Sequence, residues 1–235
     1  LWVDRVSVSK DQSIVRINGL LKHIRDSEEF EYQFWVDQVD LKKEDLSQLF
    51  DTLRTPQYRA LTDLSVTGTA NGTRDSVNVE LGFVSSVGEL SIQGQSQLTE
   101  PYNYEGSISG RNVDLSSLIA GTVDTTSLNF DANLDGFGLR LDDAVTEFSA
   151  TFYDSRINNV DFDRLEFTSS LISGLWKQDY EYQNNNEVIN GTGWVDFSRD
   201  EPPVSMQGNA QNINLTTILG TDNIASTNLN FDYNI

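Results

Sequence analysis

No cysteine occurs in this chain, which excludes disulfide bonds, thiolate metal ligands and cysteine nucleophiles. The only histidine, His23, has no second histidine with which to build a metal site or a proton relay. No stretch reaches the roughly 18 consecutive apolar residues of a membrane span, and no signal peptide begins at Leu1. These absences leave no catalytic constellation, and we expect a non-enzymatic protein.

Basic residues are scarce, and they are unevenly distributed. The chain holds 16 Lys and Arg against 36 Asp and Glu, for a net charge of −20. Residues 1–75 contain 10 basic and 13 acidic residues, which leaves 6 basic and 23 acidic residues in 76–235. Such a field repels phosphate backbones and anionic headgroups, so we expect no nucleic-acid partner.

The chain does contain an internal repeat. The heptapeptide LNFDANL at Leu128–Leu134 returns as LNFDYNI at Leu229–Ile235, and VDLSSLI at Val113–Ile119 returns as INLTTIL at Ile213–Leu219. Because the match runs through a strand end, a turn and the next strand, we expect two copies of one unit in the same register. The second copy stops inside its repeated strand, so we expect a segment cut from a longer protein.

Alternation of apolar and polar residues dominates the chain and predicts β-strands. It predicts a hairpin at Trp2–Ile17 and a strand at Phe30–Val36 whose aromatic side chains share one face. Helical spacing interrupts it at Lys43–Leu53, where we expect an amphipathic helix. From Leu61 onward the period of two returns, which is typical of an antiparallel meander.

Small and polar residues predict where the strands turn or bend. We expect turns at Asn71-Gly72 and at Ser86–Gly88. In the repeated unit, Asp114 and Asn214 are expected to cap short helices at equivalent places. A change of phase near Arg164 predicts a β-bulge.

These patterns predict an all-β fold: a long antiparallel meander, curled into a taco-like groove or sandwich-like, with short capping helices. Residues 1–100 form an N-terminal β region with one amphipathic helix. Residues 101–235 form a repeat-containing β region that continues the first and is truncated at its C-terminus. A long sheet with one apolar face must fold on itself, pack on a second sheet, or hold something apolar.

The spacing of a calcium-binding loop occurs once, at Asp131, Asn133, Asp135, Gly136 and Asp142. However, Gly138 stands at the eighth position, where such loops carry an apolar residue, and the flanks alternate as strands do. The favoured interpretation is a strand with a polar face. We therefore assign no metal, cofactor or catalytic residue, although 36 acidic residues leave glycosidase-like carboxylate pairs open.

Aromatic residues in the second half form the group Trp176, Tyr180, Tyr182 and Trp194. If these four side chains are exposed, they would stack on sugar rings. Aromatic residues on strands, however, more commonly belong to the core.

The segment Gly110–Leu139, GRNVDLSSLIAGTVDTTSLNFDANLDGFGL, with its later echoes NINLTTILG and STNLNFDYNI, is similar to a known pattern. It resembles the AsmA-like superfamily, and most closely the TamB-type translocation and assembly module proteins of Gram-negative bacteria. The resemblance depends on the Asp-Leu-Ser-x-Leu turn, the Leu-Asn-Phe strand, the following Gly-x-Gly and the strand pair SRINNVDFDRLEF. Asp45–Leu49 shows the same Asp-Leu-Ser-x-Leu spacing.

The resemblance implies a β-sheet groove that spans the periplasm and is anchored in the inner membrane by a helix outside this segment. It implies transport of phospholipids to the outer membrane, or assembly of proteins there, with acyl chains and an outer-membrane barrel assembly protein as partners and no cofactor. The alternative of a different class is a secreted carbohydrate-binding or surface-adhesion module. The expected lining of the lipid groove is the set of apolar residues Val77, Val79, Leu81, Phe83, Leu128, Phe130, Leu134, Phe148, Phe152, Leu229 and Phe231.

Overall fold

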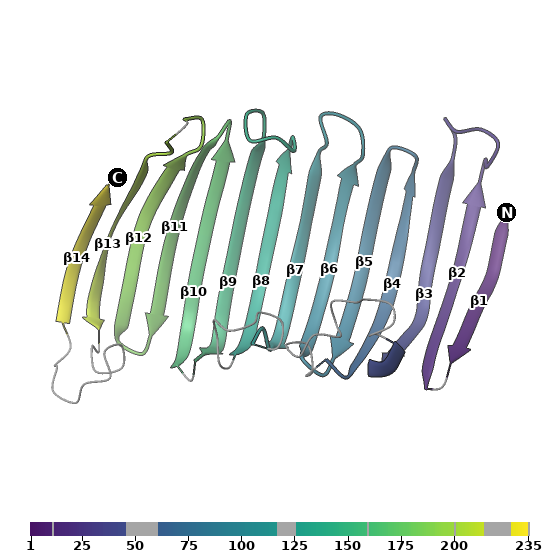
Figure 1. Cartoon of the computed structure of the whole chain (residues 1–235), viewed down its shortest axis with the longest axis horizontal. Helices are drawn as coiled ribbons and strands as arrows, with labels where there is room; N and C mark the ends of the chain where they lie inside the picture. The colour runs from purple at the N-terminus through teal and green to yellow at the C-terminus, as the bar shows by residue number, and fades with distance from the viewer. Residues whose placement is uncertain are drawn as a thin grey trace.

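A computed structural model describes residues 1–10, 12–45, 61–116, 126–158, 160–199, 201–213 and 227–234. They form one antiparallel sheet of fourteen strands, in which each strand pairs with its neighbours in sequence (Figure 1). The strands are β1 (Trp2–Lys10), β2 (Ser13–Lys22), β3 (Glu31–Lys42), β4 (Asp63–Thr73), β5 (Ser76–Ser85), β6 (Gly88–Gln97), β7 (Tyr104–Val113), β8 (Thr126–Phe137), β9 (Val145–Ile157), β10 (Val160–Ile172), β11 (Leu175–Asn184), β12 (Glu187–Asp196), β13 (Val204–Ile213) and β14 (Thr227–Asn234). The predicted all-β meander is confirmed.

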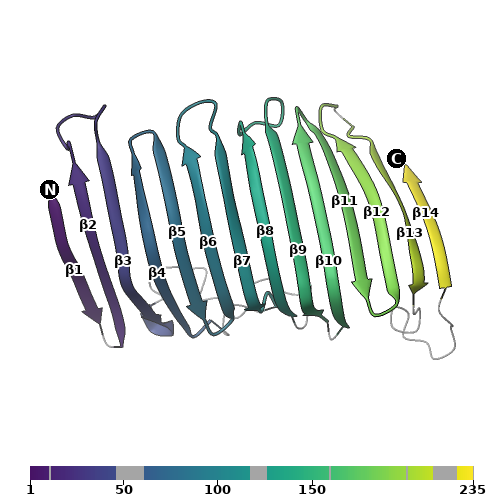
Figure 2. The same cartoon turned by 180° about the vertical axis from the view of Figure 1, so that it is seen from behind.

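The sheet is a single open layer. Seen from both sides, the described strands lie in one row with β1 and β14 at opposite ends, and no second sheet of described strands lies on either face (Figures 1 and 2). The accessible surface is 14921 Å² for 26.4 kDa. A compact monomer of this mass exposes about 10,600 Å², so the excess reflects the open layer. Of the two forms expected, the single open sheet is consistent with the meander curled into a groove and not with the sandwich-like form.

The turns follow the sequence in part. Residues 86–87 form the expected turn, and Gly88 follows it with a positive φ of 120°. The turn expected at Asn71-Gly72 is wrong, because both residues belong to β4 and the chain turns at residues 74–75. Gly72 lies directly opposite Tyr32 of β3, and a Cβ at Gly72 would come within 2.1 Å of the Ser76 carbonyl oxygen of β5 and 2.9 Å of the Tyr32 hydroxyl. The glycine therefore serves close approach between strands.

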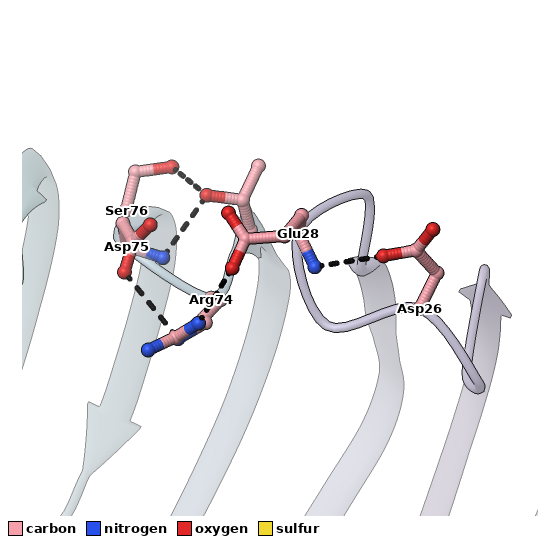
Figure 3. A network of polar contacts seen from close by, with 6 residues as sticks. Asp26, Glu28, Arg74, Asp75 and Ser76 are labelled. Carbon is pink, nitrogen blue, oxygen red and sulfur yellow. Dashed lines mark hydrogen bonds and ion pairs between the residues drawn. The ribbon is translucent and has the colours of Figure 1, made fainter.

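Polar contacts fix this turn and join it to the β2–β3 loop (Figure 3). The Arg74 guanidinium lies 3.2 Å from Glu28, and the Asp75 N–H donates to the Thr73 hydroxyl at 3.2 Å. The Glu28 N–H donates in turn to Asp26 at 3.1 Å. Each contact is exposed and contributes little free energy, but together they place the two loops side by side.

The expected helices fall mostly outside the described residues. Residues 43–45 are helical, whereas 46–53, 117–119 and 215–219 lie outside the described part of the chain, as does Asn214. Asp114 accepts a hydrogen bond from the Ser116 N–H at 3.0 Å, which is the contact expected of a capping residue.

The repeated strands share a bulge but not the expected register. Asn112 and Asn212 both have positive φ, and their N–H groups donate to the side chains of Asn129 (2.9 Å) and Asn228 (2.8 Å). In the first copy Leu128 pairs with Val113, but in the second Thr227 pairs with Ile213 and Leu229 with Ala210. The expectation of one register is therefore wrong for the second strand: LNFD has moved by two residues, so that Asn228 reaches the bulge. A shift of two keeps each side chain on its face.

The phase change near Arg164 has a different cause from the one expected. The β9–β10 register is the same on both sides of it, with Phe162 opposite Ser155 and Arg164 opposite Tyr153, so no extra residue is present. Instead Asp154 has a φ of 42°, and the register shift lies on the other side of β9, between Ser127 and Asn129 of β8. The predicted bulge at Arg164 is therefore wrong.

Aromatic rings lie over glycines of the neighbouring strand on one face. The Phe34 ring lies so close to Gly19 that a Cβ at Gly19 would be 2.6 Å from it. The Phe130 ring covers Gly110 in the same way. Gly208 is covered in the same way by Phe231. An aromatic ring that covers a cross-strand glycine shields the backbone and holds the register.

Replacing Gly110 by valine should therefore destabilise the sheet, because the new side chain must displace the Phe130 ring. We expect a loss of about 1–3 kcal/mol in the free energy of unfolding, measured by urea titration. The matched control is Gly82→Val on the opposite face, where the nearest atom to an added Cβ is the Thr67 hydroxyl oxygen at 3.4 Å. Equal losses in the two variants would contradict the packing role of Gly110.

Candidate functional site

Two ladder rows run across the whole sheet without a charged or strongly polar side chain. Consecutive members are direct partners in the thirteen ladders, so each row lies on one face. The first row is Val8, Val15, Val39, Val66, Phe83, Leu90, Gly110, Phe130, Phe152, Leu165, Tyr182, Ile189, Ala210 and Leu229. The second row is Val6, Ile17, Val36, Gly68, Leu81, Ile92, Ile108, Ala132, Ala150, Phe167, Tyr180, Gly191, Gly208 and Phe231. We call the face that carries these apolar rows the apolar face.

The apolar rows cross the whole width of the sheet, and the side chains of the apolar face are only partly buried. With neighbouring strands about 4.8 Å apart, fourteen strands extend roughly 60 Å. Parts of the face are well packed: Val113, Leu128 and Phe162 are buried at one end of the strands, and Phe130 and Phe152 pack against them. Elsewhere side chains remain open, with 40% of Leu134 and 47% of Leu229 exposed. The face therefore combines a packed margin with open apolar surface.

All eleven residues expected to line a groove lie on the apolar face. Six of them belong to the two apolar rows: Leu81, Phe83, Phe130, Phe152, Leu229 and Phe231. Val79, Leu134 and Phe148 stand two residues beyond a row member of their strand and Val77 stands four residues beyond one, whereas Leu128 lies in the packed margin. The set missed the row members of β1–β4, β6, β7 and β10–β13, which the same alternation would have identified.

The aromatic group of the second half does not form one platform. Trp176, Tyr180 and Tyr182 of β11 lie on the apolar face, opposite Leu171, Phe167 and Leu165. Trp194 pairs with Lys177 and Ser205 and lies on the other face, 39% exposed. The grouping expected from the sequence is therefore wrong.

The opposite face, which we call the polar face, carries Asn, Gln, Ser, Thr and most of the strand carboxylates. Asp131, Asn133 and Asp135 of β8 alternate along it, with Ser109, Ser107 and Glu105 as their partners on β7. The Ser109 hydroxyl and the Arg111 guanidinium, 3.2 Å away, lower the pKa of Asp131. Arg111 also lies over the Tyr153 ring, 5.2 Å from its centre. This is the strand with a polar face that the sequence favoured over a calcium loop.

Hollows follow the polar face across the sheet. The hollow over β5–β9 has a volume of about 600 Å³, and others of about 410 Å³ and 610 Å³ lie over β8–β11 and β11–β14. Their lining side chains are mainly amides, hydroxyls and carboxylates. No such chemistry was assigned from the sequence.

Within the described part of the chain, no helix has the length and hydropathy that a membrane span requires.

Calcium should leave the stability of the sheet unchanged. Alternate residues of a strand lie about 7 Å apart, so Asp131, Asn133 and Asp135 cannot converge on one ion, and Asp131 already contacts Arg111. The measurement is the thermal midpoint with millimolar calcium and with a chelator. A rise of several degrees with calcium would show that these residues bind it.

In comparisons with known proteins, no protein-family model, no curated protein and no solved structure matches the chain.

Proposed function

We propose that this chain is a non-enzymatic segment of an AsmA/TamB-like protein, and that its apolar face receives phospholipid acyl chains on their way across the periplasm to the outer membrane. The observation that carries the proposal is the pair of apolar rows, which crosses all fourteen strands without interruption. The sequence resemblance of the repeated unit supports the same family. In this proposal the inner-membrane anchor lies outside the segment.

Acyl chains require the kind of surface that the apolar rows provide. Each methylene group removed from water contributes about 0.8 kcal/mol, and an unpaired polar or charged group in its path costs more than that. A ladder row runs at right angles to the strands, so it offers a path from one edge of the sheet to the other. Because the rows contain no charged side chain, a sliding acyl chain meets no such barrier along them.

The partial exposure of the apolar face also agrees with a mobile ligand. A fixed second sheet would bury its partner face throughout, whereas Leu134 and Leu229 are 40% and 47% exposed. Contiguous exposed apolar surface commonly marks an interaction site in a soluble protein.

A role in assembling outer-membrane proteins, which the resemblance also implies, has less support from this face. An unfolded client presents backbone N–H and C=O groups that need hydrogen-bond partners. The apolar rows offer none, so we propose lipid as the ligand.

Photo-crosslinking tests the proposal in the full-length protein in cells. A photoreactive amino acid at Leu134 should give phospholipid adducts, identified by mass spectrometry of organic extracts. The adjacent residue Asn133 lies on the polar face and provides the matched control, because the same probe there should give none. Lack of adducts at Leu134, or equal adducts at both positions, would refute the proposal.

A charge on the apolar face should block transport without unfolding the sheet. Leu134→Glu places a carboxylate beside the apolar rows at a side chain that is already 40% exposed, so the charge stays hydrated. We expect phospholipid transport to fall at least tenfold in Leu134→Glu, with unchanged circular dichroism, whereas Asn133→Glu retains it. Normal transport in Leu134→Glu would contradict the role of this face.

A further inference from the structure

The polar face carries a hollow that lipid transport does not use. It lies over β5–β9, has a volume of about 600 Å³, and is open to solvent. One cross-strand row lines it, with a single residue from each strand: Asn78, Gln95, Glu105, Asp135 and Glu147. Phe137, the last residue of β8, also lines the hollow and is 42% exposed. A row of amides and carboxylates thus stands beside an exposed aromatic ring.

Of the polar side chains that line the hollow, some pair with one another and others are available to a ligand. The Gln95 amide donates to Glu105 at 2.7 Å, and the Asn103 amide donates to Gln97 at 2.9 Å. The side chains of Asn78, Asp135 and Glu147 have no hydrogen-bond or ion-pair partner among the described residues. The hollow therefore offers amide donors and acceptors together with carboxylate acceptors.

The row also places like charges next to one another. Glu105, Asp135 and Glu147 are direct partners across β7, β8 and β9, and no Lys or Arg is among the described residues that line the hollow. Like charges directly opposite one another destabilise a sheet. Sequences that break such a local rule without an evident structural gain commonly do so at functional sites.

The chemistry of the lining selects the ligand class. Phosphorylated or otherwise anionic ligands are repelled by the three carboxylates. A compact metal ion does not fit, because no group of three acidic or histidine side chains in the described chain converges closely enough to bind one. Sugar hydroxyls, by contrast, donate to carboxylates and accept from amides, while the carbon face of a sugar ring packs on an aromatic side chain.

We infer that this hollow binds a neutral oligosaccharide, which lies across β5–β9 with one ring packed against Phe137. Strands about 4.8 Å apart make the row roughly 20 Å long, enough for several sugar units. The site is on the opposite face from the apolar rows and operates whether or not those rows carry lipid. It differs from the aromatic group expected from the sequence, since Trp176 lies on the apolar face.

Isothermal titration calorimetry of the purified chain tests the inference. The probes are cellohexaose and N-acetylated chitohexaose, with hexalysine as a cationic comparison. We expect saturable binding of at least one oligosaccharide and a loss of affinity of at least tenfold in Phe137→Ala and in Asp135→Asn. Asp135→Asn removes a like-charge contact, so it should fold at least as well as the parent chain.

The matched control is Glu80→Gln, which removes a carboxylate from the polar face of β5 outside the hollow and should leave affinity unchanged. Absence of saturable binding to both oligosaccharides, or binding that survives both variants of the hollow, overturns the inference. Binding of hexalysine alone, lost in Asp135→Asn, also overturns it and identifies a cationic-peptide site. Lipid adducts at Leu134 are read separately, so failure of one proposal is distinguishable from failure of the other.

Discussion

Cross-strand register is the constraint on which this molecule depends. Side chains alternate with a period of two, so a slip of one residue in any ladder would send the apolar set of a strand to the polar face. The irregular ladders preserve the faces. Val36 and Val39 are three residues apart, as are Gly110 and Val113, and a regular strand would place the members of each pair on opposite faces. The register shift between them returns both members to the apolar face. Where two apolar residues are three positions apart, a bulge between them thus keeps both side chains on the same face.

A single layer also requires another source of packing. Sheets usually bury an apolar face against a helix or a second sheet, and the described strands have no second sheet. Packing within the layer replaces part of the missing contact with a second sheet. The rings of Phe130 and Phe231 lie on Gly110 and Gly208 and so bury apolar area. Aromatic neighbours add to it, as in the Phe130–Phe152 pair with ring centres 5.4 Å apart. Glycines on this face therefore have a packing role within strands. A strand glycine of this kind, such as Gly72, is easily mistaken for a turn residue in the sequence.

Sequence patterns predicted the features that depend on a single strand. Alternation identified the strands and the common face of the eleven apolar residues, because period two is a property of each strand alone. Features that depend on a neighbouring strand were predicted less well. Gly72 was assigned to a turn because its role opposite Tyr32 involves another strand. Trp194 was grouped with Trp176 because both are aromatic residues of neighbouring strands, but across the turn at residues 185–186 the partner of Trp176 is Val195, so Trp194 lies on the opposite face. The two-residue shift of LNFD likewise depends on Asn228 reaching the N–H of Asn212.

The two faces are chemically independent although they share one backbone. Leu134 and Asn133 are adjacent in sequence, yet the first stands beside the apolar rows and the second among amides and carboxylates. A strand pattern that builds a long apolar face necessarily builds a polar face of equal length. The carboxylates of the polar face then have a physical role, because their charge opposes association of open sheets through exposed apolar surface. That role needs charge somewhere on the polar face, but it does not need three carboxylates in direct opposition across β7–β9. Solubility therefore accounts for charge on the polar face, whereas the direct opposition of Glu105, Asp135 and Glu147 needs a separate cause, which the oligosaccharide that we infer would supply.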